Sequence, residues 1–153
     1  MTTNNYCFNT STIRNCGLSL QTEIELVAQA GFAGIELWVS EIKAYIKDGG
    51  TLVKLKEILI QNRIKVPNLI AFFEWANPDP EKRKVAHADA IRIFEMAQAL
   101  DCPYVAAPPF GVADRTDIPL HDIADYYQAL LKATAALPVM PLLEFWGHSK
   151  TLG

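Results

Sequence analysis

The sequence has few cysteines, and their number and spacing exclude two common kinds of small protein. Only Cys7, Cys16 and Cys102 are present, an odd number with no Cys-x-x-Cys pair. A disulfide framework needs paired cysteines and a zinc knuckle needs closely spaced ones, so we expect a reducing compartment. Because Cys7 and Cys102 lie in or beside apolar runs, we predict that both are small core residues rather than catalytic thiols.

Positive charge and long apolar runs are also scarce. The net charge is -3 at pH 7, and the only dense basic cluster, residues 82–84, is interpreted as the solvated start of a helix. No apolar run approaches the length of a membrane span, and the N-terminus lacks the basic and apolar regions of a signal peptide. We therefore expect a cytoplasmic protein with no nucleic-acid partner and no membrane partner.

What the sequence does contain is an alternation of short apolar runs with amphipathic stretches. Its 153 residues, half of them hydrophobic, suit one globular domain. Five apolar runs are typical of strands, and they cover residues 6–11, 34–38, 64–74, 104–109 and 139–146. Four amphipathic stretches predict helices around residues 20–30, 52–59, 80–100 and 123–131. Strand–helix alternation of this kind favours a parallel sheet with right-handed crossovers.

Local residues mark several ends of these elements. Ser19 is suited to cap the first helix and Gly31 to stop it. Asp79 and Pro80 predict the start of the third helix, since proline is well tolerated at the first helical position. Pro67 removes one ladder donor from the third strand. The residues of the third helix that we expect to face inward are Ala88, Ile91 and Phe94.

Two architectures fit this alternation. One is an open doubly wound sheet, for which five strands are enough. The other is a (β/α)8 barrel, which needs eight strands and usually about 250 residues. The first turn, "STIRNCGLSL", carries no G-x-G-x-x-G fingerprint and there is no P-loop, so nothing supports a nucleotide-binding sheet.

Carboxylates stand at the ends of three expected strands. In the second strand, Glu36 and Trp38 share one side, and Ile35 and Leu37 share the other. In the fifth strand, Glu144 likewise lies on the side opposite to Leu143. Because the apolar side suits the helix layer, we predict that Glu36 and Glu74 or Glu144 point toward the mouth of a barrel, where barrel enzymes keep their sites.

Each of these residues also has a structural interpretation. Glu36 could form an ion pair with an inward lysine or arginine, since a buried carboxylate must be paired, protonated or metal-bound. Glu74 could simply end the third strand. His148, which follows Gly147, could be an ordinary surface histidine.

The succession of motifs resembles the sugar phosphate isomerase/epimerase family, the xylose isomerase-like TIM barrels. The segment "SLQTEIELVAQAGFAGIELW" is similar to that family's first helix and second strand, and "AIRIFEMAQALDCPYVAAPP" to its third helix and fourth strand. "PLLEFWG" is similar to its fifth strand, which ends in a glutamate followed by an aromatic residue or histidine. The resemblance covers nearly the whole chain and implies a partial (β/α)8 TIM barrel: residues 1–153 form the N-terminal part, an incomplete domain truncated after strand five.

The resemblance also implies roles for single residues. The fifth-strand glutamate of the family is a metal ligand and serves as a base, and this role falls on Glu144. Glu36 matches a position that lines the substrate pocket, and we assign its neighbours at the predicted mouth to substrate binding as well. These neighbours are Trp38, Glu74, Trp146 and His148. The remaining ligands of the family come from strands six, seven and eight, so this chain is expected to carry only part of the site.

The implied chemistry is that of a divalent-metal-dependent sugar or sugar-phosphate isomerase or epimerase acting through an enediolate. The expected cofactor is Mn²⁺, Mg²⁺, Co²⁺ or Zn²⁺ and the expected substrate a small sugar or polyol; a dehydratase of the same family is a further possibility. We expect the chain alone to bind metal weakly and to turn over little or no substrate.

Two rival interpretations remain. The endonuclease IV-like branch of the same barrel places histidines after strands three and four, and "FFEWAN" and "AAPPFG" have none. The other is a non-catalytic fragment or interaction subunit completed by another chain. Five strands leave open edges at the first and the fifth, through which the chain could self-associate.

Overall fold

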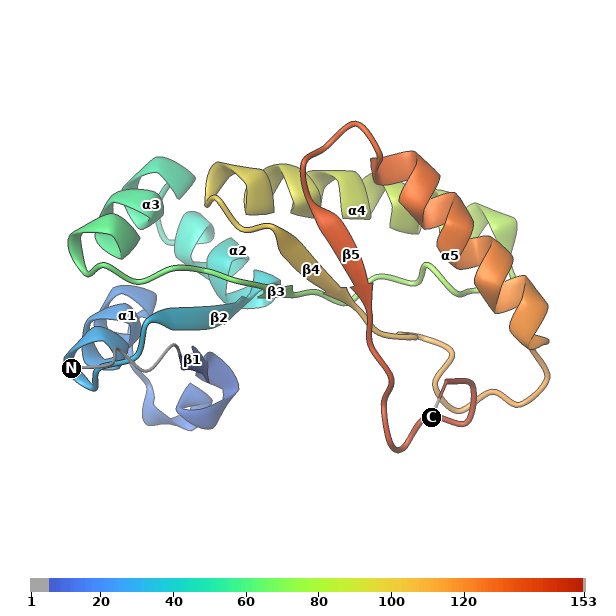
Figure 1. The fold of residues 1–153 in the computed structure, drawn as a ribbon, viewed down its shortest axis with the longest axis horizontal. Coiled ribbons are helices and arrows are strands. Elements are labelled where there is room, and N and C mark those ends of the chain that lie inside the picture. The colour runs from blue at the N-terminus through green and yellow to red at the C-terminus, as the bar shows by residue number, and fades with distance from the viewer. Residues whose placement is uncertain (1–5, 153) are drawn as a thin grey trace.

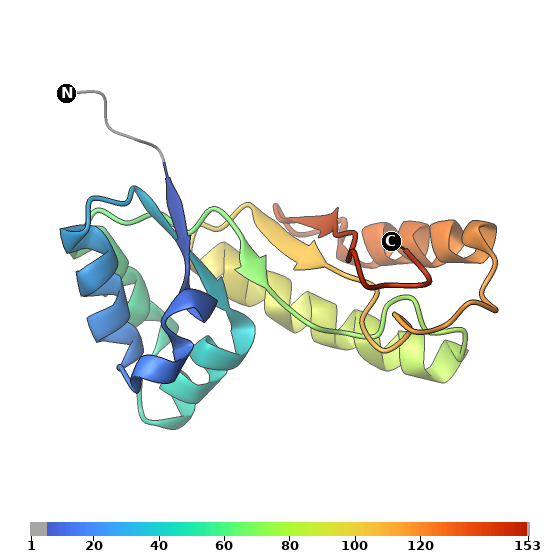
Figure 2. The same cartoon turned by 90° about the horizontal axis from the view of Figure 1, so that it is seen from below.

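The computed structural model describes residues 6–152 and contains a five-stranded parallel sheet (Figure 1). Its strands are β1 Cys7–Asn9, β2 Gly34–Trp38, β3 Leu69–Ile70, β4 Tyr104–Ala107 and β5 Met140–Leu143. Five α-helices join them: α1 Leu20–Gln29, α2 Val39–Lys47, α3 Leu52–Gln61, α4 Pro80–Ala99 and α5 Leu120–Thr134. Figures 1 and 2 show the strands side by side, with the helices packed outside them.

The order of the strands decides between the two architectures. They lie in the order β1-β2-β3-β4-β5, and every neighbouring pair is parallel. In a doubly wound sheet the strand order reverses at a switch point, with strands added on both sides of the first. Strictly sequential addition is instead the topology of a (β/α)8 barrel. The chain therefore forms a partial TIM barrel of five strands and five helices, as its sequence predicts except for the number of helices.

The helix that the sequence analysis missed is α2. It begins directly after β2, at Val39, and ends before Gly49, whose φ of 92° is left-handed. The Glu41 carboxylate accepts a hydrogen bond from the backbone N–H of Trp38 at 3.1 Å, which caps the helix start. Val39 and Ile42 are its only buried residues. No loop separates the helix from β2, and Trp38 occupies the N-cap position in place of a serine, threonine, aspartate or asparagine, so no start signal marks the helix in the sequence.

The third strand is much shorter than predicted. Gly34 pairs with Lys65, whereas Leu37 pairs with Leu69, so three steps along β2 correspond to four on its partner. The extra residue is a bulge in the segment that contains Pro67, which has no N–H for the ladder. Because of this bulge, the alternation of side chains between the two sides of the sheet shifts by one residue within the segment.

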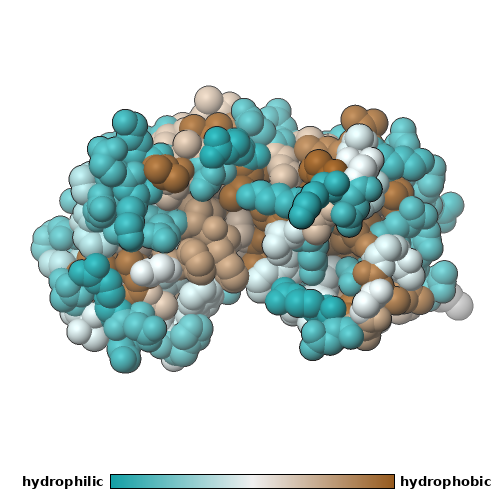
Figure 3. Space-filling view, turned by 180° about the vertical axis from the view of Figure 1, so that it is seen from behind, coloured by the Kyte–Doolittle hydropathy of each residue, from teal (hydrophilic) through white to brown (hydrophobic). Residues whose placement is uncertain are grey.

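The ends of the helices agree with the sequence, but the buried face of α4 does not. The Ser19 hydroxyl accepts from the N–H of Thr22 at 3.2 Å, and the Asp79 carboxylate accepts from that of Glu81 at 2.9 Å. Phe94 is buried as predicted, but Ala88 and Ile91 are exposed. The buried residues of α4 are Ala86, Ala90, Ile93, Phe94 and Ala97. Three of these five are alanines, which allow the helix to approach the sheet closely. Figure 3 shows apolar surface in the middle of the face seen from behind.

The cysteines divide between core and surface. Cys102 is buried, and burial raises the pKa of its thiol to about 11, so it is an inert core residue as predicted. Cys7 is exposed, so the prediction of a core residue was wrong there, because its side of β1 is the open side of the sheet. None of the described helices is long and apolar enough to cross a membrane.

One partly buried imidazole should make the stability depend on pH. The Nε2 atom of His87 on α4 is buried without a hydrogen-bond partner, and burial together with nearby Arg83 lowers its pKa. Since the unfolded imidazole takes up a proton below about pH 6.5, the free energy of unfolding should fall as the pH drops below that value. We expect His87→Leu to flatten this fall, measured by urea unfolding at pH 7 and pH 5. His121→Leu, which removes an exposed imidazole, should keep the wild-type dependence; equal losses in wild type and His87→Leu would contradict the assignment.

Candidate active site at the barrel mouth

The candidate site lies at the carboxyl ends of the strands, on the side of the sheet that faces away from the helices. In β2, Ile35 and Leu37 are fully buried in the helix layer while Glu36 between them is half-buried. In β5, Pro141 is buried whereas Met140 and Leu142 are exposed. The predicted alternation is therefore confirmed within β2 and β5, and Glu36 stands on the open side. Continued beyond β5, the same alternation predicts that side for Glu144.

Glu36 is held by two asparagines from the neighbouring strand segments. Asn9 donates a hydrogen bond from Nδ2 to Oε2 at 2.6 Å, and Asn68 donates one from Nδ2 to Oε1 at 2.7 Å. No ion pair within residues 6–152 includes Glu36, so the alternative of a lysine or arginine partner does not hold in this structure. A carboxylate that accepts one bond on each oxygen is fixed in orientation and keeps further lone pairs for a ligand.

Trp38 extends this network toward the mouth. Its indole Nε1 donates to Oδ1 of Asn9 at 3.2 Å, so that one asparagine orients both Trp38 and Glu36. The guanidinium carbon of Arg14 lies 4.0 Å from the centre of the indole ring, in cation–π geometry. The structure thus brings Glu36 and Trp38 together, as predicted, and adds a cation beside them.

Aromatic side chains surround the rest of the mouth, and Phe72 is the one they share. Its ring meets Trp38 edge-on with centroids 5.3 Å apart and Trp146 edge-on at 5.6 Å, and it stacks on Phe110 at 5.1 Å. The ring of Trp146 stacks in turn on that of His148 at 5.1 Å. Trp146 therefore belongs to the cluster, while His148 lies exposed at its margin.

Glu74 lies apart from Glu36, in a groove beside α4. Asn77 donates from Nδ2 to its Oε2 at 2.6 Å. The groove has a volume of about 430 Å³ and is lined by apolar residues, including Phe72 and Phe110, with charged groups of α4 at its rim. Glu74 is therefore next to the aromatic cluster and is held in place, rather than merely ending a strand.

Glu144 follows the last residue of β5. Its backbone N–H approaches the carbonyl oxygen of Ala107 at 3.5 Å, so it continues the pairing of β5 with β4. Its side chain is half-buried and takes part in none of the hydrogen bonds or ion pairs found among residues 6–152. It is neither enclosed by helices nor fixed by an arginine, which leaves both carboxylate oxygens available.

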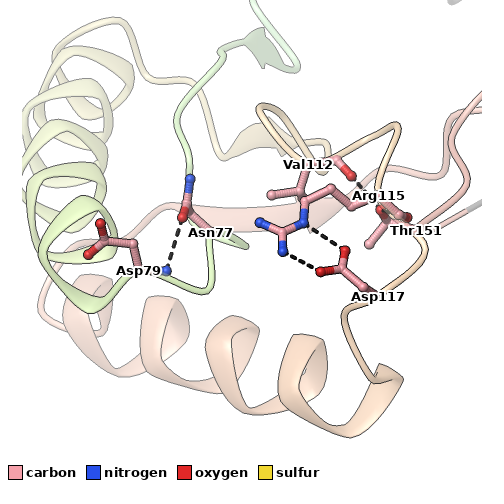
Figure 4. Close-up of polar contacts among 6 residues, drawn as sticks. All are labelled: Asn77, Asp79, Val112, Arg115, Asp117 and Thr151. Carbon is pink, nitrogen blue, oxygen red and sulfur yellow. Dashed lines mark hydrogen bonds and ion pairs between the residues drawn. The ribbon is translucent and has the colours of Figure 1, made fainter.

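The segment after Glu144 is fastened to the loop between β4 and α5 (Figure 4). The Thr151 hydroxyl contacts the carbonyl oxygens of Val112 and Arg115, and Ser149 donates to that of Ala113 at 3.3 Å. In the same view Arg115 pairs with Asp117 through two hydrogen bonds of 2.9 and 2.6 Å. These contacts fix the path of residues 145–152 and thereby the position of Trp146.

The sequence analysis did not single out the asparagines or Phe72. Asn9 could have been found, because it is the last residue of the first strand and lies on the same side as Cys7. Asn68 could not, since the bulge that directs it toward Glu36 depends on the pairing with β2. Phe72 was one residue of an apolar run, and nothing in that run distinguished it from Phe73.

A divalent ion would find one suitable ligand in the described residues. The free carboxylate of Glu144 is the kind of oxygen donor that hard ions prefer. Between residues 6 and 152, however, no three His, Cys, Asp or Glu side chains are grouped so that they could hold a metal. Glu144 thus fits as one member of a ligand set whose other members these residues do not supply.

The family model described as xylose isomerase-like TIM barrel matches residues 24–152. The chain belongs to this family. No curated protein matches it in sequence. The match includes β2, the Glu36 position and the whole of β5 with Glu144.

Several solved structures have the same fold. The structure of IolI protein with a zinc atom is 24% identical, with a TM-score of 0.82, covering 95% of this chain and 53% of that chain. D-psicose 3-epimerase with D-tagatose, from Clostridium cellulolyticum H10, is 19% identical, with a TM-score of 0.76 and coverage of 98% and 54%. The probable 3-DHS dehydratase AsbF from Bacillus anthracis is 13% identical, with a TM-score of 0.79 and coverage of 97% and 54%. The chain spans about half the length of these structures.

Proposed function

We propose that this chain supplies the first part of the active site of a divalent-metal-dependent sugar or polyol isomerase or epimerase. The observation that carries the proposal is the common placement of Glu36 and Glu144 on the open side of a partial TIM barrel, at the strand ends where barrel enzymes bind their substrates. Family membership supports the reaction class, since epimerase and dehydratase structures have the same fold.

Substrate binding is assigned to Glu36 and the aromatic cluster. Because Asn9 and Asn68 fix its carboxylate, Glu36 can accept hydrogen bonds from substrate hydroxyls without reorganising. The faces of Trp38 and Trp146 can pack against the C–H groups of a sugar. Glu74 and His148 lie at the margins of this surface, where they would contact parts of the substrate remote from the reacting carbons.

Metal binding and proton transfer are assigned to Glu144. A divalent ion, Mn²⁺, Mg²⁺, Co²⁺ or Zn²⁺, would polarise the carbonyl oxygen next to the reacting carbon. Glu144 would bind that ion through one oxygen and would take the proton from the adjacent C–H group with the other. The other ligands would come from strands beyond β5, in the same polypeptide or in another one.

A non-catalytic subunit completed by another chain is the second candidate. It is favoured by the apolar open side of the sheet, where Met140 is 56% exposed and the adjacent Tyr104 41%. In a closed barrel, strands opposite would cover these side chains. Self-association through the open edges at β1 and β5 stays a prediction.

Titration with Mn²⁺ tests the role of Glu144. The paramagnetic ion should broaden amide NMR signals around Glu144 and Ala107 at concentrations above the micromolar range, because one carboxylate binds such ions weakly. Glu144→Gln should abolish this local broadening, while Glu57→Gln, on the exposed face of α3, should leave it unchanged. Broadening that persists in Glu144→Gln would sink the assignment, and sub-micromolar affinity would show that the chain already holds a complete site.

A further inference from the structure

A second acidic site adjoins the barrel mouth, around Glu23 on α1, and Arg14 lies between the two. This residue is only 6% exposed. Its carboxylate forms no hydrogen bond and no ion pair with any group in the described part of the chain. Its oxygens are not among the fully enclosed polar atoms of the described residues, so they reach the adjoining cavity. Because so little of the residue is exposed, the charge loses much of its hydration and gains no protein partner in exchange.

Glu23 lines a cavity of about 350 Å³ between α1 and α2. Two further carboxylates, Glu41 and Asp48, lie on its wall, and Arg14 is the only lysine or arginine among the lining residues. The remaining walls are largely apolar or aromatic; they include Leu18, Leu20, Ala44 and Tyr45. The cavity thus combines an excess of negative charge with space for a short hydrocarbon chain.

The charged neighbours of Glu23 are engaged elsewhere. The guanidinium of Arg14 lies over the ring of Trp38, at 4.0 Å. One oxygen of Glu41 accepts hydrogen bonds from Oγ1 of Thr10, at 2.6 Å, and from the backbone N–H of Trp38. Burial raises the pKa of the Glu23 carboxyl, and the nearby charge of Glu41 raises it further. Arg14 lowers it, but by less than the other two effects raise it.

We infer that this cavity binds a small alkylammonium ligand, with its ammonium group paired to Glu23 and its carbon chain against the apolar wall. An ammonium group donates three hydrogen bonds and can satisfy Glu23 together with the free oxygen of Glu41. Tyr45 adds an aromatic ring to the cavity wall. A metal ion is a poorer fit, because the described residues contain no group of three or more metal-ligating side chains. This site adjoins the proposed catalytic one through Arg14 and Glu41 but includes none of the residues assigned there.

The probe for this site is 1,4-diaminobutane, added at constant ionic strength to the ¹⁵N-labelled chain. We expect saturable shifts of amide signals in the first turn of α1 and the last turn of α2, and none with 1,4-butanediol, which has the same carbon chain without charge. Glu23→Gln should weaken binding at least tenfold. Glu57→Gln, which removes the same charge from an exposed position outside the cavity, should bind as wild type.

A second variant tests the cavity without changing its charge. Ala44 is exposed at the cavity wall, and Ala44→Leu keeps a good helix former while filling part of the space. It should also weaken binding, while unfolding at the wild-type temperature. Equal binding of the diamine by Glu23→Gln and wild type, equal shifts with the diol, or undiminished binding by a folded Ala44→Leu would each overturn the inference.

Discussion

Replacing Trp75 with alanine should lower the free energy of unfolding by about 3–5 kcal/mol, the cost typical of removing a large aromatic side chain from a core. Trp75 is fully buried, its Nε1 donates to the carbonyl oxygen of Pro108 at 2.7 Å, and its ring meets that of Tyr127 at 5.3 Å. It therefore joins the segment after β3 to the loop after β4 and to α5. Because domains are stable by only about 5–15 kcal/mol, this one change should remove a large part of the total.

Urea unfolding followed by circular dichroism measures this loss. Trp75→Phe keeps most of the buried ring but loses the hydrogen bond. It should therefore lower the free energy of unfolding clearly less than Trp75→Ala does. Trp146→Ala, at a half-buried position on the open side, should cost least of the three. If Trp75→Ala lowered the free energy of unfolding no more than Trp146→Ala, the assignment of Trp75 as a central core residue would be wrong.

Gly111→Ala should be the second most damaging change, because two penalties combine there. The φ angle of Gly111 is +81°, which costs an L-residue about 1–2 kcal/mol. A Cβ atom at this position would also lie 2.8 Å from Cγ and 3.0 Å from Cδ of Glu74. Since Asn77 holds the end of that side chain, relieving the clash should cost about 1–3 kcal/mol more, as overpacking usually does.

Gly31→Ala is the matched control for the steric part. Its φ is +85°, and an added Cβ would meet nothing within 4 Å. Thermal or urea unfolding should therefore show a clearly larger loss for Gly111→Ala, and the Asn77 side-chain amide signals should shift only in that variant. Similar losses in both variants would mean that Glu74 moves away freely and is not held against the loop.

Much of the fold could be predicted from local sequence signals. Ser19 and Asp79 marked helix starts because a side-chain oxygen that satisfies free backbone N–H groups acts within one turn. The alternation in "GIELW" placed Ile35 and Leu37 in the core and Glu36 on the other side, since a strand has only two sides. Helix α2 was missed because it follows β2 without a loop and has Trp38, not a capping residue, at its N-cap position.

The candidate site was predictable only in part. Glu36, Trp38 and Trp146 were found through their positions at strand ends, and the structure brings all three to one mouth. Glu74 was found too, but its place in a groove beside α4 follows from its contact with Gly111 and its bond to Asn77. The roles assigned to these residues and to Glu144 remain predictions.

The sequence by itself determined the parallel strand–helix alternation, the ends of the main helices and the family. These depend on hydrophobic period, capping groups and short motifs, which act between residues close together in the chain. The tertiary structure alone decided the order of the strands, the narrow alanine face of α4 and the bulge at Pro67 that turns Asn68 toward Glu36. Each of these results from contacts between segments far apart in the chain, where packing and hydrogen bonding across the sheet outweigh local preference.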